Sequence, residues 1–517
     1  MNNNEATSQL ESKGANNDHR TEDLFQRNLL QIFCSLDLHK KALTLANPNI
    51  ELQPVSLKMD DSTAGPPQES PVVYLHLVDI SSNNQSQLLF PVYEREIFKI
   101  GRDIRTNSLA IDNDPDMLVS RNHCEVYVVV YEPTVNHIYV RDRKSSNGTL
   151  VNGRLIGSGP RISPGYLLQH VVQYQPSPRH DLTALQQEES KLFASKYELT
   201  DHCLGHGAEA AVCLANDVQT GKQLVCKLVN LDKIHGKNAQ NDIRRKFQEA
   251  DILRQLNHPN ILSYVDAISS PHTLYTFTEL ASGGDLMSFI MRRGIVKESE
   301  SIIIIRQVVR ALAYLHEKGI VHRDIKPENI LLAYSPRIAY HRVMLSDFGT
   351  SAVPRRSRMI TNAGTAGYQA PEFETTGEAH TTAVDIWSLG VVAITLLVSD
   401  HHDAVLNQMA EEEIRQYVTR VFSYLQKRPS VDAAKFVLSC LRLNPMRRIT
   451  AQGAKGHKWL CGTTKNVELF KRLDKMVMSS WQPQNALRPM PWSLPDLVPP
   501  PSHRKLDCYS LRDELTW

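Results

Sequence analysis

The chain has 517 residues, and its 58 Lys and Arg against 56 Asp and Glu leave a formal net charge of +2. This length predicts about three domains with real hydrophobic cores, and so balanced a charge does not by itself indicate nucleic acid or an anionic membrane as partner. The 8 Cys form no C-x-x-C pair, which argues against a zinc site or a disulfide framework and indicates a reducing compartment. The longest apolar run, Trp387–Val398, is shorter than the roughly 20 residues of a membrane span, and no signal pattern opens the chain, so we expect a cytosolic or nuclear protein.

Residues 1–71 are rich in Asn, Ser, Asp and Gln, and this composition predicts a mostly disordered arm. A helix is predicted within it near residues 21–46. Its apolar residues recur at roughly helical spacing, after Thr21 and Glu22 as start signals. The pattern fits a helix packed on its own protein and a partner-binding helix equally well.

The rest of the chain divides into four segments that differ in residue composition and apolar pattern. Residues 72–175 carry short β-branched and aromatic runs separated by Asn, Gly, Pro and Asp, which predicts an all-β sandwich. Residues 176–196 are expected to be a linker, and residues 197–460 change from strands to long helical patterns, which predicts a two-lobed α+β domain. The Pro-rich residues 461–517 are expected to form an extended tail.

The α+β segment contains the parts that transfer of a phosphoryl group requires, in the order that such a site uses them. A glycine turn at residues 204–212, with Gly205 and Gly207, would bring backbone N–H groups to phosphate oxygens. Lys227 would hold the α and β phosphates, and Glu249 would pair with it from a helix. Taken alone, the turn is better explained as a plain hairpin and the ion pair as a surface pair of little consequence.

The run HRDIKPEN is the strongest signal in the chain. Asp324 would receive the proton of the attacking hydroxyl, Lys326 would lie near the transferred phosphate, and Asn329 would bind magnesium. A DFG triplet follows, in which Asp347 would bind the Mg²⁺ that bridges the ATP phosphates. An Asp before a turn is often only a cap, but the joint order of these motifs makes that explanation weak.

Residues 197–460 therefore resemble a eukaryotic Ser/Thr protein kinase over the whole domain. The resemblance implies that Asp324, Lys326, Lys227 and Glu249 form the catalytic set and that Asn329 and Asp347 hold the metal. It also implies that Glu372 pairs with Arg448, that Asp385 anchors the catalytic loop and that Thr278 is the gatekeeper. The residues that would contact ATP on the same grounds are Leu204, Gly205, Gly207, Val212, Lys227, Glu279, Ala281 and Asp285.

The same resemblance indicates the acceptor and a switch. Lys326 and the GTAGY run favour Ser or Thr over Tyr as acceptor. Asp285 and Glu328 lie where related kinases hold an Arg, which suggests substrates of the form Arg-x-x-Ser/Thr, although solvated carboxylates remain the alternative. Thr361 has the spacing of an activation-loop phosphothreonine that would face Arg323, and an unmodified loop threonine is the rival explanation.

The β segment carries Gly101-Arg102, SRNH (120–123) and SSNGT (145–149). Each fragment alone is ordinary, since NG pairs are common in hairpin turns, but together they resemble a forkhead-associated (FHA) domain, a β-sandwich whose loops bind phosphothreonine peptides. Arg102 would supply a guanidinium fork and Ser120 a hydroxyl donor for phosphate. The resemblance implies that Asn147 holds the peptide backbone, while Gly101 and His123 shape the loops.

An FHA domain ahead of a Ser/Thr kinase resembles the checkpoint-kinase-2-like family, which includes fungal DNA-damage and meiotic-recombination kinases. The resemblance implies a nuclear enzyme, possible also in the cytoplasm, that is activated by an upstream kinase or by trans-autophosphorylation and recruited to a phosphothreonine partner. The chain has no Thr-Gln dipeptide, so we expect that partner to be a separate adaptor or chromosome-axis protein. Ala210 at the third glycine position and Glu209 at the loop tip depart from the family pattern and keep a phosphopeptide-binding pseudokinase scaffold as the alternative.

Overall fold

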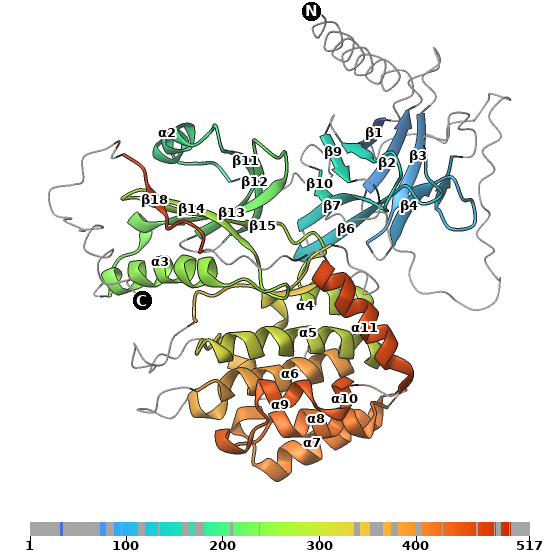
Figure 1. Cartoon of the computed structure of the whole chain (residues 1–517), viewed down its shortest axis with the longest axis vertical. Helices are drawn as coiled ribbons and strands as arrows, with labels where there is room; N and C mark the ends of the chain where they lie inside the picture. Colours follow the sequence, from blue (N-terminus) through green and yellow to red (C-terminus); the bar gives the residue numbers. More distant parts are fainter. Residues whose placement is uncertain are drawn as a thin grey trace, which may run out of the picture.

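The structure is a computed structural model of the whole chain (Figure 1). It describes residues 31–34, 73–78, 87–94, 96–111, 119–132, 135–151, 154–157, 159, 165–168, 180–206, 210–236, 238–334, 342–351, 366–373, 381–399, 406–425, 428–461, 464–479, 481, 487–495 and 497. The structural statements below concern these residues.

The first domain is built from strands, as the β-branched runs predict; they pair antiparallel except for β4 and β5, which are parallel. A three-stranded sheet has the order β1-β2-β3, a five-stranded sheet has the order β10-β7-β6-β4-β5, and β8 and β9 form a hairpin. Its apolar core lies on one face of the long strands β6 and β7 and includes Val126, Val128 and Val140. The strands are β1 (Gln31–Cys34), β2 (Val73–Val78), β3 (Gln87–Val92), β4 (Ile97–Gly101), β5 (Leu109–Ala110), β6 (Cys124–Glu132), β7 (Val135–Asp142), β8 (Thr149–Val151), β9 (Arg154–Gly157) and β10 (Tyr166–Leu167).

Strand β1 corrects the predicted helix near residues 21–46. Only Gln31–Cys34 of that segment are described, and they pair antiparallel with β2, from Gln31 opposite Val78 to Cys34 opposite Leu75. An apolar run this short fits a strand as well as a helix, and the available edge of β2 decides between them. The other residues of the predicted helix lie outside the described part of the chain.

The second domain begins with the N lobe, a sheet of order β11-β12-β13-β15-β14-β18 with helix α3 beside it (Figure 1). Side chains alternate between the two faces of the sheet along β12 and β13. Cys213 and Cys226 lie opposite each other and belong to the core, and the next cross-strand pair is Val212 and Lys227. The elements are β11 (Tyr197–His206), β12 (Ala210–Asp217), β13 (Gln223–Asn230), η1 (Leu231–Lys233), α3 (Ala239–Gln255), β14 (Tyr264–Ser269) and β15 (Thr273–Glu279).

The C lobe is helical and is organised around α5 (Glu298–Glu317) and α6 (Ala383–Val398). All but two residues of α6 are buried, which explains why its sequence is apolar all round without being a membrane span. The other elements are α4 (Leu286–Arg293), η2 (Pro327–Asn329), β16 (Ile330–Leu332), β17 (Val343–Leu345), η4 (Ala366–Tyr368), η5 (Pro371–Phe373), η6 (Leu406–Gln408), α7 (Glu411–Tyr424), α8 (Val431–Cys440), η7 (Pro445–Arg447), α9 (Ala451–Lys455) and α10 (Lys458–Cys461).

Two segments expected to be irregular contain regular structure. The linker includes helix α2 (Ala184–Leu192), which begins with a capping box between Thr183 and Gln186. The tail includes helix α11 (Thr464–Ser479) and strand β18 (Trp492–Ser493). The Pro-rich composition that predicted an extended tail starts only after α11, whose Phe470, Leu473 and Val477 recur at helical spacing and are buried.

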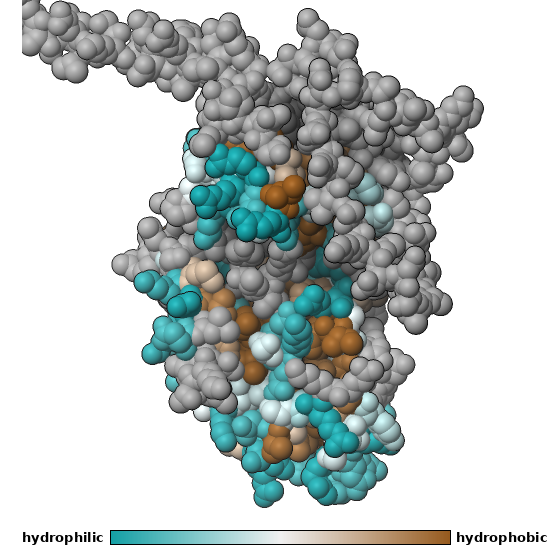
Figure 2. Space-filling view, turned by 90° about the vertical axis from the view of Figure 1, so that its right-hand side faces the viewer, coloured by the Kyte–Doolittle hydropathy of each residue, from teal (hydrophilic) through white to brown (hydrophobic). Residues whose placement is uncertain are grey.

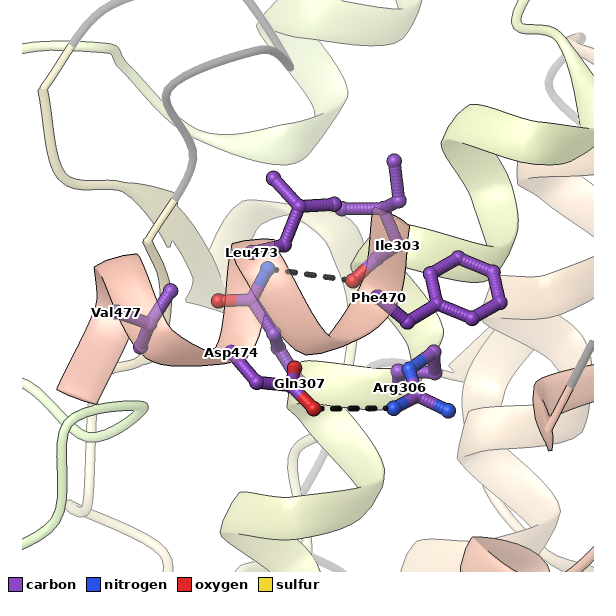
Figure 3. A pocket seen from close by; sticks show the side chains of 7 residues that line it. All are labelled: Ile303, Arg306, Gln307, Phe470, Leu473, Asp474 and Val477. Carbon is purple, nitrogen blue, oxygen red and sulfur yellow. Dashed lines mark hydrogen bonds and ion pairs between the residues drawn. The ribbon is translucent and has the colours of Figure 1, made fainter. Parts of the chain in front are cut away.

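Helix α11 packs against α5 (Figure 3). Arg306 lies over the ring of Phe470, with its guanidinium carbon 4.6 Å from the ring centroid, and it also pairs with Asp474 at 3.3 Å. The cavity between the two helices measures only about 10 Å³, which is room for one water at most. This seam is therefore a packing contact and not a ligand site.

The two domains contact each other at the segment that joins the N lobe and the C lobe. Tyr127 of β6 is fully buried, and its hydroxyl lies 3.0 Å from the backbone oxygens of both Ser282 and Tyr334. Gly284 has a φ of +81°, and an added Cβ there would lie 2.6 Å from Val129 of β6, so both the backbone and the space require glycine. The FHA-like sandwich and the lobe connection therefore pack as complementary surfaces.

None of the described helices is long and apolar enough to cross a membrane. Figure 2 shows the face on the right of Figure 1, where hydrophobic residues of the described part form separate patches among hydrophilic ones.

Candidate functional site

Lys227 and Glu249 meet at the centre of the N lobe. Lys227 lies on β13 opposite Val212 and Thr276, and its Nζ is 2.6 Å from Glu249 Oε1 on α3 and 3.9 Å from Asp347 Oδ1. Burial lowers the pKa of Lys227, but the negative charges of Glu249 and Asp347 outweigh it, so the pKa lies above its ordinary value. Lys227 is thus held as a cation, in a position to bind phosphate oxygens.

The HRDIKPEN run forms a loop in which three polar side chains converge. Asn329 Nδ2 donates to Asp324 Oδ2 at 2.8 Å, and Lys326 Nζ lies 3.0 Å from the same carboxylate oxygen. Asp324 is therefore held in one orientation by a cation and an amide, as a carboxylate that orients a hydroxyl nucleophile must be.

Asp385 anchors this loop from inside α6. Its carboxylate accepts the backbone N–H groups of His322 at 3.0 Å and Arg323 at 2.8 Å, and it lies 2.8 Å from His316 Nε2. Burial raises the pKa of Asp385, but the bond to His316 and the bonds from the loop lower it overall. The anchor matters because Arg323 adopts a φ of 68°, which a non-glycine residue keeps only when its surroundings hold it.

Asp347 follows β17, which pairs with β16 directly after the HRDIKPEN run, and it lies 3.9 Å from Lys227 Nζ. Its φ is 57°, its carboxylate accepts the backbone N–H of Gly349 at 3.3 Å, and Phe348 is buried against His322 with ring centroids 5.0 Å apart. Burial raises the pKa of Asp347, but the charge of Lys227 and the Gly349 bond lower it overall. The carboxylate is therefore ionised and ready to bind a cation.

The donor set fits magnesium. Asp347 and Asn329 offer a carboxylate and an amide, the oxygen ligands that Mg²⁺ prefers, and Mg²⁺ usually completes its shell with phosphate oxygens and waters. Among the described residues, no three His, Cys, Asp or Glu side chains gather closely enough to hold a metal.

The residues expected around the nucleotide come from both lobes. Leu204 and Gly205 lie on β11, Val212 on β12 beside Lys227, and Glu279, Ala281 and Asp285 lie on the connection to the C lobe. Gly207 and Glu209 lie outside the described residues, as do Thr361 and the arginines before it. The loop tip and the activation-loop switch therefore stay predictions.

One residue of this site was missed by the sequence reasoning. Arg342, which immediately precedes β17, donates through Nη1 and Nη2 to the Glu279 carboxylate at 2.7 and 2.5 Å. The charge of Glu279 holds the pKa of Arg342 above its ordinary value despite burial. The pair ties the lobe connection to the C lobe, and nothing in the local sequence around either residue signals it.

Asp285 and Glu328 lie near enough for their charges to interact. Asp285 caps α4, and its carboxylate accepts the backbone N–H of Ser288 at 2.7 Å. Burial raises the pKa of Asp285, and the negative charge of Glu328 adds to the rise. A cation between these two carboxylates would favour their charged forms, because it offsets the repulsion between their negative charges.

A second candidate site lies at the loop end of the β-sandwich. The backbone of Arg102 donates to Ser120 O at 3.0 Å, and Ser120 Oγ accepts the N–H of Ser146 at 2.9 Å, next to exposed Asn147. His123 Nδ1 accepts the N–H of Ser120 at 3.1 Å. The structure therefore brings all three expected peptide contacts, Arg102, Ser120 and Asn147, to one place.

Two further residues shape this second site and were not foreseen. Asp142, at the end of β7, accepts the hydroxyl of Thr149 at 2.7 Å and the N–H of Lys144 at 2.8 Å, which folds the SSNGT turn. Asn107 Nδ2 donates to Arg121 O at 2.7 Å. The signal for Asp142 was present, because an Asp just before a Ser- and Gly-rich turn commonly bonds the turn's backbone.

Comparisons with known proteins match both domains. A protein kinase domain matches residues 199–460, and an FHA domain matches residues 98–169. The meiosis-specific serine/threonine-protein kinase mek1 of Schizosaccharomyces pombe is 30% identical over 417 residues, which cover 78% of this chain and 89% of that protein. Human calcium/calmodulin-dependent protein kinase type 1B is 34% identical over 276 residues, covering 52% of this chain and 77% of that protein. The matches confirm the predicted order of an FHA domain followed by a kinase domain.

Proposed function

This chain belongs to the protein kinase family and is a protein Ser/Thr kinase with an FHA domain, and we propose that it phosphorylates Arg-x-x-Ser/Thr sites in a DNA-damage or meiotic-recombination checkpoint. The family uses ATP with a divalent metal, and the donor set of Asp347 and Asn329 supports Mg²⁺ as that metal. One observation carries the proposal most directly: Lys227 lies 2.6 Å from Glu249 and 3.9 Å from Asp347, the arrangement that phosphoryl transfer requires.

The chain's own residues divide the work of transfer. Lys227 holds the α and β phosphates, Asp347 and Asn329 hold the metal, and Lys326 lies beside the carboxylate of Asp324 where it can neutralise the moving phosphoryl group. Asp324 orients the substrate hydroxyl and accepts its proton. The metal, when bound, offsets the negative charge that develops on the phosphate oxygens.

The proximity of Asp285 and Glu328 supports the Arg-x-x-Ser/Thr preference. Glu328 is exposed, and its negative charge acts with burial to raise the pKa of half-buried Asp285, although bonds from Ser288 oppose the rise. A substrate guanidinium between the two carboxylates would relieve that repulsion and donate to both. The preference therefore follows from charge, and a peptide with Ala at that position should be a poorer substrate.

In this proposal, the FHA domain recruits the kinase to its partner. FHA domains bind phosphothreonine peptides, and the loops with Arg102, Ser120 and Asn147 lie at one end of the sandwich, where a partner can reach them. Docking on a phosphorylated adaptor or chromosome-axis protein would raise the local concentration of kinase domains and promote trans-autophosphorylation at Thr361. The proposed location is the nucleus, with some enzyme in the cytoplasm. The meiotic name of the S. pombe relative supports the meiotic role in this proposal.

Two measurements test the proposal. The first is transfer of labelled phosphate from Mg-ATP to Arg-x-x-Thr and Ala-x-x-Thr peptides by the wild type and by Asp347→Ala; we expect transfer by the wild type only, with the Arg peptide preferred. A silent wild type, even when phosphorylated at Thr361, would instead support a pseudokinase scaffold. The second is binding of phosphothreonine peptides by the wild type and Arg102→Ala, where the variant should lose most of its affinity. Equal binding by both would contradict the phosphopeptide site of the FHA domain.

A further inference from the structure

The segment after α11 returns to the N lobe. Trp481 Nε1 donates to Asn257 Oδ1 at 2.8 Å, just beyond the end of α3. Further along, Arg254 Nη1, on the last turn of α3, donates to the backbone oxygen of Arg488 at 2.9 Å. We call the described residues of this segment, Trp481 and 487–494, the strap.

The strap then joins the N-lobe sheet as strand β18, which lies against β14 (Figure 1). The backbone N–H of Leu494 donates to Ser269 O at 2.7 Å. Leu494 is 8% exposed and belongs to the core above the sheet. Trp492 Nε1 donates to Asp266 Oδ1 at 3.2 Å, and Lys196 Nζ lies 4.6 Å from the Trp492 ring centroid. Two apolar side chains and several polar bonds therefore fix the strap to the sheet.

The other end of the strap is fixed to the C lobe by α11. Phe470, Leu473 and Val477 are buried against α5, and Asp474 of α11 pairs with Arg306 and Arg310 of α5. Figure 3 shows Phe470, Leu473, Val477 and Asp474 of α11 beside Arg306 of α5. The strap therefore connects the two lobes along a path separate from the connection at residues 280–285.

The point of attachment matters because α3 carries Glu249. Arg254, five residues after Glu249 on the same helix, is buried and also bonds Asp251 through Nη2 at 2.6 Å. A helix held at its last turn, and at the turn that follows it, can swing Glu249 away from Lys227 only by breaking these contacts.

We propose that the strap is a positioning element that keeps Glu249 paired with Lys227, so that the kinase binds the phosphates of ATP in a preorganised site. This rests on the proposed function, since Lys227 is taken to hold the α and β phosphates. The strap touches neither nucleotide nor substrate, so its residues act through α3. Loss of the strap should weaken binding of ATP but not of adenosine, which lacks the phosphates that Lys227 would hold.

The test compares Leu494→Ala, which loosens the strap in the core, with Leu497→Ala, the same substitution at a residue that is 42% exposed in the same segment. Dissociation constants of full-length protein for Mg-ATP and for adenosine are measured by calorimetric titration, at a temperature where every variant is folded. We expect Leu494→Ala to weaken ATP binding by about fivefold with adenosine binding unchanged, and Leu497→Ala to match the wild type. Trp492→Ala, at a partly exposed position, should act in the same direction without disturbing the core.

Two results would overturn the proposal. One is an unchanged affinity for ATP in both Leu494→Ala and Trp492→Ala. The other is an equal loss of ATP and adenosine affinity, because general loosening of the fold weakens both ligands alike. If the wild type binds Mg-ATP no more tightly than adenosine, the role given to Lys227 in the proposed function is refuted instead. The wild type thus tests the proposed function, and the variants test the strap.

Discussion

Acidification is expected to weaken the contact between the FHA domain and the kinase domain through His137. His137 of β7 lies with its Nδ1 3.1 Å from His202 Nε2 of β11, and both side chains are buried. Burial, and then the neighbouring His202, lower the pKa of His137 from its ordinary 6.5 to about 3. Since the unfolded chain takes up a proton near pH 6.5 and the folded chain does not, stability is full above that pH and is lost as the pH falls toward 3.

These pKa values give the size of the effect. Between about pH 7.5 and 5.5, a group that titrates near 6.5 when unfolded and near 3 when folded loses about 1.4 kcal/mol of stabilisation. For a cooperative unit of several hundred residues that corresponds to about 2 °C in Tm. On going from about pH 7.5 to 5.5, the Tm of the wild type should therefore fall by about 2 °C more than the Tm of His137→Gln.

Thermal unfolding of both proteins at the two pH values gives the change in Tm with pH for each. Subtracting one change from the other cancels the titration of other groups such as His258. His235→Gln provides the control, because His235 is exposed and lies outside the contact, and it should retain the pH dependence of the wild type. An identical loss of Tm in wild type and His137→Gln would refute the reasoning.

Three further substitutions probe contacts described above. Tyr127→Phe removes the hydroxyl next to Ser282 O, and its unfolding free energy should fall by about 1–3 kcal/mol, measured by thermal unfolding against Tyr424→Phe at an 81% exposed tyrosine. Glu372→Ala removes the carboxylate that lies 2.6 Å from the buried guanidinium of Arg448. The guanidinium keeps its bonds to backbone oxygens but loses its charged partner, which should cost about 3 kcal/mol or more in a denaturant titration. Glu328→Gln should lower kcat/KM for an Arg-x-x-Thr peptide by about fivefold and leave that for an Ala-x-x-Thr peptide unchanged.

The sequence predicted the parts of the site that are set by short-range chemistry. The residues of HRDIKPEN lie within one loop, so Asp324, Lys326 and Asn329 meet there because the chain between them is short. The β-branched runs likewise predicted strands such as β6 and β7, since side-chain alternation is local. Lys227, Glu249 and Asp347 lie on three separate elements, so their spacing in the sequence could not predict that they meet. The order of the motifs along the chain did predict it.

The sequence did not predict contacts that depend on distant surfaces. Arg342 and Glu279 are 63 residues apart and Tyr127 and Ser282 are 155 apart, and no local pattern marks either pair as a contact. The same holds for the end of the chain, where the Pro-rich composition concealed β18. Two residues are enough for that strand because the edge of β14 and the core beneath Leu494 supply its partners.

The position of the FHA domain limits how its peptide could influence catalysis. Its sheet contacts the lobe connection through Tyr127 and Val129, whereas Arg102, Ser120 and Asn147 lie on loops at the end of the sandwich. A ligand shifts a conformational equilibrium only by as much as it binds one state better than the other. A phosphopeptide on those loops would thus have to move β6 itself to act on the ATP site, against a contact in which Tyr127, Val129 and Leu280 are all buried. Recruitment needs no such movement, because bringing two kinases to one partner raises their encounter rate while each stays in the conformation described above.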